Sequence, residues 1–162
     1  MSGRLGGMSD PCAVAHGDAG DEAAVRTLVA VFASPVADYL SRFGAELGFR
    51  TAVYDPTRDA GLPVLDENTD VVVTNHHREE LGPVLRDVLA YPVRWVGVLG
   101  NPRHPGPHVE ALKQLGVPGP DIDRVHRPVG LNIGSRTPPE IALATLAGLI
   151  ADRNGRPGGF AF

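Results

Sequence analysis

Residues 27–54 decide the fold, and they read TLVAVFASPVADYLSRFGAELGFRTAVY. Residues 27–33 form an unbroken apolar run rich in β-branched side chains, which predicts a strand buried on both faces. Residues 35–47 follow a helical pattern that ends at Gly48, with an apolar stripe made of Val36, Leu40, Phe43 and Leu47. Residues 49–54 predict a second strand. This strand–helix–strand order indicates a parallel pair joined by a right-handed crossover.

The same alternation continues along the rest of the chain. Further strands are expected at 70–74, 93–99 and 125–126, and further helices at 79–90, 107–115 and 137–154. We therefore predict an α/β fold of the Rossmann-like kind, a doubly wound and mostly parallel sheet. Ligands of such sheets bind beyond the carboxyl ends of the strands, where the strand order reverses.

Composition excludes several kinds of partner. The chain has 162 residues, of which 43% are hydrophobic and 21% charged, which is enough for one domain with its own core. A net charge of -4 and a pI of about 5.8 argue against nucleic acid or an anionic membrane as a partner. The longest apolar run, 141–151, is too short to span a bilayer.

Three segments are expected along the chain. Residues 1–25 are predicted to be a flexible leader, 26–156 the Rossmann domain, and 157–162 a loose tail. The leader lacks the apolar core of a signal peptide, so a cytoplasmic location is expected. It also carries the single cysteine, Cys12, which excludes a disulfide framework and a multi-cysteine zinc site.

The turn after the first strand lacks the glycines of a dinucleotide-binding site. Such a site has G-x-G-x-x-G there, so that the backbone can approach a pyrophosphate. Here the turn reads Ala33-Ser34-Pro35, and a proline has no N–H to offer. Ser34 can still cap the helix or bind an anion. Asp55, at the end of the second strand, either binds a ribose hydroxyl or begins a simple turn, Asp55-Pro56-Thr57.

Polar residues also follow the third and fourth strands. Asn75 and His77 could bind a ligand, transfer protons or hold a metal. No Cys, Asp or His set at metal-ligand spacing accompanies them, so no metal site is predicted. Arg103, with His104 and His108, is either a phosphate contact or part of a solvated helix start.

The loop 130–136 is glycine-punctuated and runs into a strong helix start. Residues 137–140 form a T-x-x-E capping box with a proline at the first helical position. The loop residues able to approach or bond a ligand include Gly134, Ser135 and Arg136. An arginine beside glycine-rich backbone suits a phosphate or carboxylate, and the alternative is a structural arginine that bonds backbone carbonyls.

Four segments give the chain a resemblance to a known family. They are the buried first strand, DVVVT at 70–74 with its histidine-containing loop, WVGVLGNPRH at 95–104, and HRPVGLNIGSRTPPEIA at 126–142. The last is similar to the pattern H-x-P-[IV]-G-L-D-I-G-A-x-T-P-x-E-I-A of the XdhC/CoxI family. The chain thus resembles the Rossmann domain of these accessory proteins, which serve molybdenum hydroxylases such as xanthine dehydrogenase and aerobic CO dehydrogenase.

The resemblance implies a role in enzyme maturation. Members of the family bind the molybdenum cofactor, of molybdopterin type, shield it while its terminal sulfur ligand is installed, and help to deliver it to the client enzyme. Together with the residue patterns above, the candidate cofactor-binding residues are Ser34, Asp55, Asn75, His77, Gly100, Asn101, Arg103, Gly134, Ser135 and Arg136. The chain departs from the family at the first turn, which is usually of the G-A-G type, and has Asn132 in place of an aspartate.

Three functions remain open from the sequence. The first is a non-catalytic accessory factor that binds the molybdenum cofactor or a molybdenum hydroxylase client. The second is an NAD(P)-dependent oxidoreductase with an atypical phosphate loop, motivated by Asp55 and by the polarity of the helix that begins near Pro35. The third is a degenerate Rossmann scaffold that binds only protein. No catalytic residue is predicted, and a homodimer stays open.

Overall fold

The computed structural model describes residues 24–162, so Cys12 and nearly all of the expected leader lie outside the described residues. One sheet has the strand order β2-β1-β3-β4-β5, and every pairing in it is parallel. Its strands are β1 (Arg26–Val31), β2 (Phe49–Tyr54), β3 (Thr69–Val73), β4 (Trp95–Val98) and β5 (Val125–His126). The predicted doubly wound, Rossmann-like α/β fold is confirmed.

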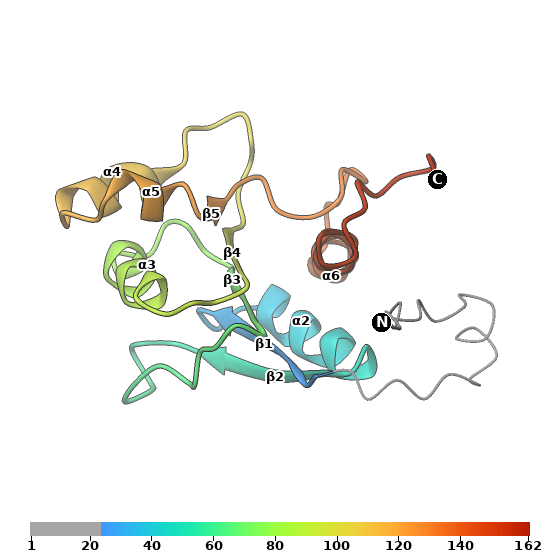
Figure 1. The fold of residues 1–162 in the computed structure, drawn as a ribbon, viewed down its shortest axis with the longest axis horizontal. Coiled ribbons are helices and arrows are strands. Elements are labelled where there is room, and N and C mark those ends of the chain that lie inside the picture. Colours follow the sequence, from blue (N-terminus) through green and yellow to red (C-terminus); the bar gives the residue numbers. More distant parts are fainter. Residues whose placement is uncertain (1–23) are drawn as a thin grey trace, which may run out of the picture.

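Helices cover both faces of this sheet (Figure 1). On one face, α2 (Pro35–Glu46) packs against α6 (Pro138–Arg153). On the other lie α3 (Leu81–Leu89), α4 (Pro107–Gln114) and α5 (Gly119–Ile122). A parallel sheet needs this double cover because its strands are apolar on both sides. Within residues 24–162, no helix is long and apolar enough to cross a membrane.

The core alternates between the two faces along the central strands. In β1, Leu28 and Ala30 pack with α2 and α6, whereas Val29 and Val31 pack with α3. Val72 of β3, paired with Ala30, belongs to the first set. All five side chains are at most 1% exposed, so β1 and β3 are buried on both faces, as the apolar run predicts.

Helix α2 faces the sheet with smaller side chains than the sequence pattern indicates. Leu40 of the expected stripe is buried, but Leu47 is 41% exposed, and the other buried residues are Ala37 and Gly44. A Cβ on Gly44 would lie 3.0 Å from Leu28 Cδ2, so the helix approaches β1 closely here. The expected stripe is wrong at Leu47 alone, because Val36 and Phe43 are half-buried against the same core, and the small residues add close packing on the sheet.

The remaining expected elements are present, and their ends differ from the expected ones by at most two residues. The addition is α5, a short helix after Pro118 that the sequence analysis did not predict. A helix of four residues is too short to show a hydrophobic period, and Ile122 is its one buried residue.

At the amino ends of the strands, a buried carboxylate ties α6 to the sheet. Asp70 on β3 is fully buried and accepts hydrogen bonds from Arg94 Nε and Arg153 Nη2. Arg94 also donates to Asp152, near the end of α6, at 2.7 Å. A buried ionised carboxylate requires such partners. The cluster therefore fixes the last turn of α6 over the sheet, opposite the edge where a ligand is expected.

The start of α6 is fixed by the predicted capping box. Thr137 Oγ1 accepts a hydrogen bond from the Glu140 N–H, and the Glu140 carboxylate accepts from the N–H groups of Thr137 and Arg136. These bonds lower the pKa of Glu140, first through the Arg136 N–H. The capping box therefore uses N–H groups that a helix start would otherwise leave free.

Loss of the cap should destabilise the domain. We expect Thr137→Ala to lower the free energy of unfolding by about 1 kcal/mol, because the first turn of α6 loses its hydroxyl acceptor. Urea denaturation followed by circular dichroism measures the change. Thr137→Ser keeps the hydroxyl and serves as the control, expected within about 0.5 kcal/mol of the wild type. An equal loss in both variants would contradict the capping role.

Candidate functional site

The strand order reverses between β1 and β3, which makes the carboxyl edge of the sheet the expected ligand site. The loops at this edge span residues 32–34, 55–58, 74–80, 99–106 and 126–136. All of the predicted binding residues lie in these segments. They do not, however, have the same surroundings.

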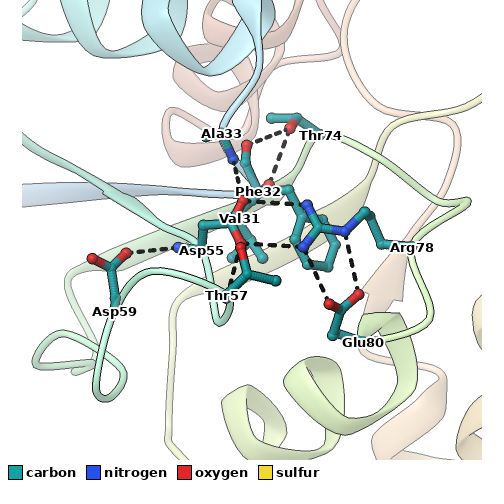
Figure 2. Close-up of polar contacts among 9 residues, drawn as sticks. All are labelled: Val31, Phe32, Ala33, Asp55, Thr57, Asp59, Thr74, Arg78 and Glu80. Carbon is teal, nitrogen blue, oxygen red and sulfur yellow. Dashed lines mark hydrogen bonds and ion pairs between the residues drawn. The ribbon is translucent and has the colours of Figure 1, made fainter.

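A buried ion pair underlies the β1–β2 side of the edge (Figure 2). Asp55 is 4% exposed, and each of its carboxylate oxygens lies 3.2 Å from a guanidinium nitrogen of Arg78. Asp55 also accepts hydrogen bonds from the Ala33 N–H and from the N–H and hydroxyl of Thr57. Glu80 binds the same guanidinium at 3.2 Å. The carboxylate predicted to meet a ribose is thus engaged by the protein's own donors.

These contacts set the protonation states of the pair. Hydrogen bonds from Arg78 hold the pKa of Asp55 well below its ordinary value, although burial opposes the shift. The bonds to Asp55 and Glu80 raise the pKa of Arg78. A carboxyl with a depressed pKa stabilises the folded state above the ordinary aspartate pKa of about 4, and this contribution is lost as the pH falls further.

The turn after β1 is built around Phe32 where a nucleotide-binding turn would have glycine. Phe32 has a φ of +71°, in the left-handed region that L residues rarely adopt, and its side chain is fully buried. The Arg78 guanidinium lies 4.6 Å from the centre of the ring (Figure 2). Burial of the ring and its contact with the cation offset a backbone strain of about 1–2 kcal/mol.

The backbone donors of this turn are bonded within the protein. The Ala33 N–H donates to Asp55, the Ala37 N–H donates to Ser34 Oγ, and Pro35 has no N–H. Ser34 therefore caps α2, one of the two roles expected for it. Few donors are left at this helix start for a pyrophosphate.

A hydroxyl pair joins the loops on either side of the point where the strand order reverses. Ser34 Oγ donates to Thr74 Oγ1 at 2.9 Å. Thr74 Oγ1 in turn lies 3.0 Å from the Val31 carbonyl oxygen and 2.9 Å from that of Phe32. The loops after β1 and β3 are thus tied to each other where a dinucleotide would need room.

Asn75 and His77 form a tight turn at the start of the next loop. Asn75 Oδ1 accepts a hydrogen bond from the His77 N–H at 2.9 Å, and the His77 ring is exposed. His76 points back to the sheet, with Nδ1 3.0 Å from the Leu99 carbonyl oxygen, and its pKa is lowered chiefly by burial. Across residues 24–162, no three His, Cys, Asp or Glu side chains are placed to hold a metal ion.

Asn101 organises the loop after β4. Its Oδ1 accepts from the Arg103 N–H, and its carbonyl oxygen accepts from the His104 N–H and, at 2.9 Å, from Arg127 Nη2. Gly100 lies against the same guanidinium, since a Cβ there would come within 2.7 Å of Arg127 Cζ. The Arg103 side chain is exposed and makes no hydrogen bond or ion pair with any described residue.

The loop before α6 divides between packing and exposure. Gly130 has a φ of +88° and lies against the backbone of α6 beside Gly148, so it packs on the helix and does not face the edge. Gly134 is exposed, and no atom lies within 4 Å of the position of a Cβ. Ser135 Oγ donates to a carbonyl in the first turn of α6 at 3.3 Å. The Arg136 side chain is exposed and bonds to none of the described residues.

The predicted residues lie in two different surroundings. Ser34 and Asp55 belong to the bonded network on the β1–β2 side. The others stand on the loops after β3, β4 and β5. No hydrogen bond between described residues joins the segment 100–104 to the segment 134–136.

Sequence analysis missed several residues that shape the edge. Arg78 and Thr74 were not singled out, although both stand in the loop after β3, and neither was Arg127, which lies within the segment similar to the family. His108 is only 5% exposed, so the expectation of a solvated helix start is wrong. The sequence offered one signal for Arg78, Thr74 and Arg127, which is that each lies at the end of a predicted strand or in the loop that follows it, at the carboxyl edge of the sheet.

A hollow of about 240 Å³ lies on the α6 side of β4 and β5, apart from these residues. Trp95 and His126, whose rings stack at 5.0 Å, line it together with Asp152 and Arg156. None of the predicted binding residues lines it.

Known proteins resemble this chain in sequence and in structure. Residues 28–149 match the family model of the XdhC Rossmann domain. The uncharacterized protein YqeB of Escherichia coli (strain K12) is 30% identical over 155 residues, which cover 82% of this chain and 28% of that protein. A crystal structure described as a xanthine dehydrogenase from Bacillus halodurans shares the fold, with a TM-score of 0.64 at 22% identity. That match covers 85% of this chain and 45% of the other, so the chain spans less than half of either relative.

The pair of Asp55 and Arg78 predicts a pH-dependent loss of stability on substitution. We expect Arg78→Met to destabilise the domain most at neutral pH, because it leaves Asp55 charged and buried without its partner. The difference from the wild type should shrink as the pH falls below about 4, because Asp55 is then protonated in the unfolded chain and in the unpaired variant, whereas the ion pair keeps it charged in the folded wild type to lower pH.

Urea denaturation at a series of pH values from 7 to 3 measures this difference. Arg86→Met removes an arginine from an exposed pair with Asp87 and is the matched control, expected to have little effect at any pH. A loss in Arg78→Met that is constant across the series would argue against the role of the pair.

The bonded turn after β1 also predicts the absence of nicotinamide cofactor binding. We expect no saturable change in the fluorescence of NADH or NADPH when either is titrated to millimolar concentration, because the N–H donors at the start of α2 are already bonded within the protein. An NAD-dependent dehydrogenase serves as the positive control. Saturable binding would instead support the oxidoreductase hypothesis.

Proposed function

The chain belongs to the XdhC family, and on this basis we propose that it is an accessory protein in the maturation of a molybdenum hydroxylase of the xanthine dehydrogenase or CO dehydrogenase type. The bound cofactor, the client enzyme and a cytoplasmic location are parts of this proposal. They are proposals because the relatives are much longer than this chain.

One observation carries the proposal: the segments 99–108 and 126–137 contain arginines and histidines but no Asp or Glu. Both segments follow strands at the carboxyl edge of the sheet, after β4 and β5. The arginines are Arg103, Arg127 and Arg136. In a chain whose net charge is -4, the three arginines of these segments outnumber the one carboxylate that the described chain places beside them, that of Glu140 on the Arg136 N–H, and they offer a local positive surface suited to an anionic ligand.

The residues on this side fit an anionic cofactor. The side chains of Arg103 and Arg136 are exposed and free to bind, Gly134 leaves open space, and two nitrogens of Arg127 are buried without a partner. A bound cofactor of the molybdopterin type would supply the molybdenum centre on which a client enzyme depends. The residues proposed to hold it are Gly100, Asn101, Arg103, Gly134, Ser135 and Arg136, with Asn75 and His77 beside them.

The β1–β2 side of the edge is less suited to a ligand. Ser34 caps α2 and Asp55 is paired with Arg78, so we propose that these two residues shape the turn and do not contact the cofactor. The same bonding weighs against the oxidoreductase alternative, which needs the donors at the start of α2.

Native mass spectrometry on protein from a molybdenum-replete host tests the proposal. We expect a pterin-sized adduct on the wild type and its loss in Arg136→Ala, with affinity reduced at least about tenfold, as for a lost charge-assisted hydrogen bond. The melting temperature should not change, since the Arg136 side chain is exposed and bonds to no described residue.

Arg42→Ala, which removes an exposed arginine from α2, is the matched control and should keep the adduct. A dinucleotide mass instead of a pterin would support the oxidoreductase alternative. Bare wild-type protein that captures a molybdenum hydroxylase would support the protein-binding scaffold, and equal adducts in wild type and Arg136→Ala would refute the site.

A further inference from the structure

The side chain of Arg127 is half-buried and has bonding capacity left over. It follows β5, and its Nη2 donates to the Asn101 carbonyl oxygen at 2.9 Å. Its Nε and Nη1 are closed off from solvent and have no hydrogen-bond partner among the described residues. No carboxylate in residues 24–162 lies within the 4.0 Å of an ion pair with it. These two buried nitrogens lack the partners that buried charged groups normally have.

A second unpartnered group lies beside it. His108, in the first turn of α4, is 5% exposed, and its Nδ1 is buried without a partner. Burial first, and then the charge of Arg127, lower the pKa of His108. The neutral ring holds one N–H, so it can donate one hydrogen bond without adding a second positive charge.

Two glycines let the loop 100–106 lie directly on these groups. A Cβ on Gly100 would stand 2.7 Å from Cζ and Nη2 of Arg127. A Cβ on Gly106 would stand 2.7 Å from Nδ1 of His108 and 3.4 Å from Cδ of Arg127. The Arg127 and His108 side chains therefore both lie under the Gly106 end of the loop, and a side chain at either glycine would collide with them.

We propose that Arg127 and His108 form a binding site for the phosphate group of a small-molecule ligand, covered by the loop 100–106. Once Nη2 leaves the Asn101 carbonyl, it can pair with Nε or with Nη1 to present two parallel N–H donors, the geometry that suits a tetrahedral oxyanion, and His108 adds a third. The inference rests on the proposed function for its premise that a ligand enters at this edge of the sheet, and it names the group that the ligand presents there.

The covering loop must shift for the ligand to reach these nitrogens. Within the described chain, one hydrogen bond ties the loop to a residue outside itself and α4, and that bond comes from Arg127 to Asn101. Phosphate at Arg127 would replace the loop carbonyl with a charged acceptor, which forms the stronger bond. The same arginine thus holds the loop down and would bind the ligand when the loop lifts.

Calorimetric titration of the whole chain with inorganic phosphate tests the site. We expect the wild type to bind, and Arg127→Gln to bind at least about tenfold more weakly. His108→Leu fills the buried position with an apolar side chain that cannot donate a hydrogen bond, and it should weaken binding by a smaller factor. Lys113→Gln makes the same charge change at an exposed position of α4 and should stay within about twofold of the wild type.

Three results would overturn the inference: no binding by the wild type, equal binding by Arg127→Gln, or an equal loss in Lys113→Gln. Parallel titration with adenosine 5′-monophosphate separates the sources of the phosphate group. Tighter binding of the ester than of the free ion means that the group belongs to a larger ligand, and equal affinities mean that the ion itself suffices.

A measurement on the wild type keeps the test decisive if Arg127→Gln loses its fold. In the ¹⁵N-labelled protein, the Arg127 Nε–H resonance should shift on addition of phosphate, and an unmoved resonance would overturn the site. Phosphate binding by protein that retains no pterin would refute the proposed function alone. Pterin retention by a wild type that ignores phosphate would refute this inference alone.

Discussion

The ion pair of Asp55 and Arg78 is the contact on which the carboxyl edge of the sheet depends. It joins the end of β2 to the loop after β3 and, through the Ala33 N–H, holds the turn after β1 between them. Three neighbouring strands are thereby fixed relative to one another at their ends. Because a buried charge that loses its partner costs far more than the pair contributes, neither side chain can change alone without cost.

This pair gives the two halves of the edge opposite characters. On the β1–β2 side, carboxylates, hydroxyls and backbone donors are used within the protein, and the hydroxyls of Ser34 and Thr74 hold the loops together. On the side of β4 and β5, the segments 99–108 and 126–137 contain no carboxylates, and their arginine side chains are exposed or keep nitrogens without a partner among the described residues. In a sheet of this kind, the place for a ligand therefore depends on where bonding capacity remains as well as on where the strand order reverses.

Much of this could be predicted from the sequence, because strands, helices and caps leave local patterns. The buried run 27–33, the capping box at Thr137 and the order of elements follow from neighbours along the chain. The partners of Asp55 could not be predicted, because Arg78 reaches it only after the sheet has formed. The burial of His108 and the small-residue face of α2 likewise depend on which surfaces meet, and the left-handed backbone of Phe32 is favoured only by contacts distant in sequence.

The ring of Phe32 limits how this domain can change in evolution. Glycine at this position would relax a φ of +71°, but it would leave a cavity in the core and take away the face on which Arg78 rests. The loss of a buried aromatic side chain costs about 3–5 kcal/mol, more than the strain of about 1–2 kcal/mol that it would relieve. A single substitution of Phe32 by glycine, the first step toward a glycine-rich phosphate turn, would therefore destabilise the domain.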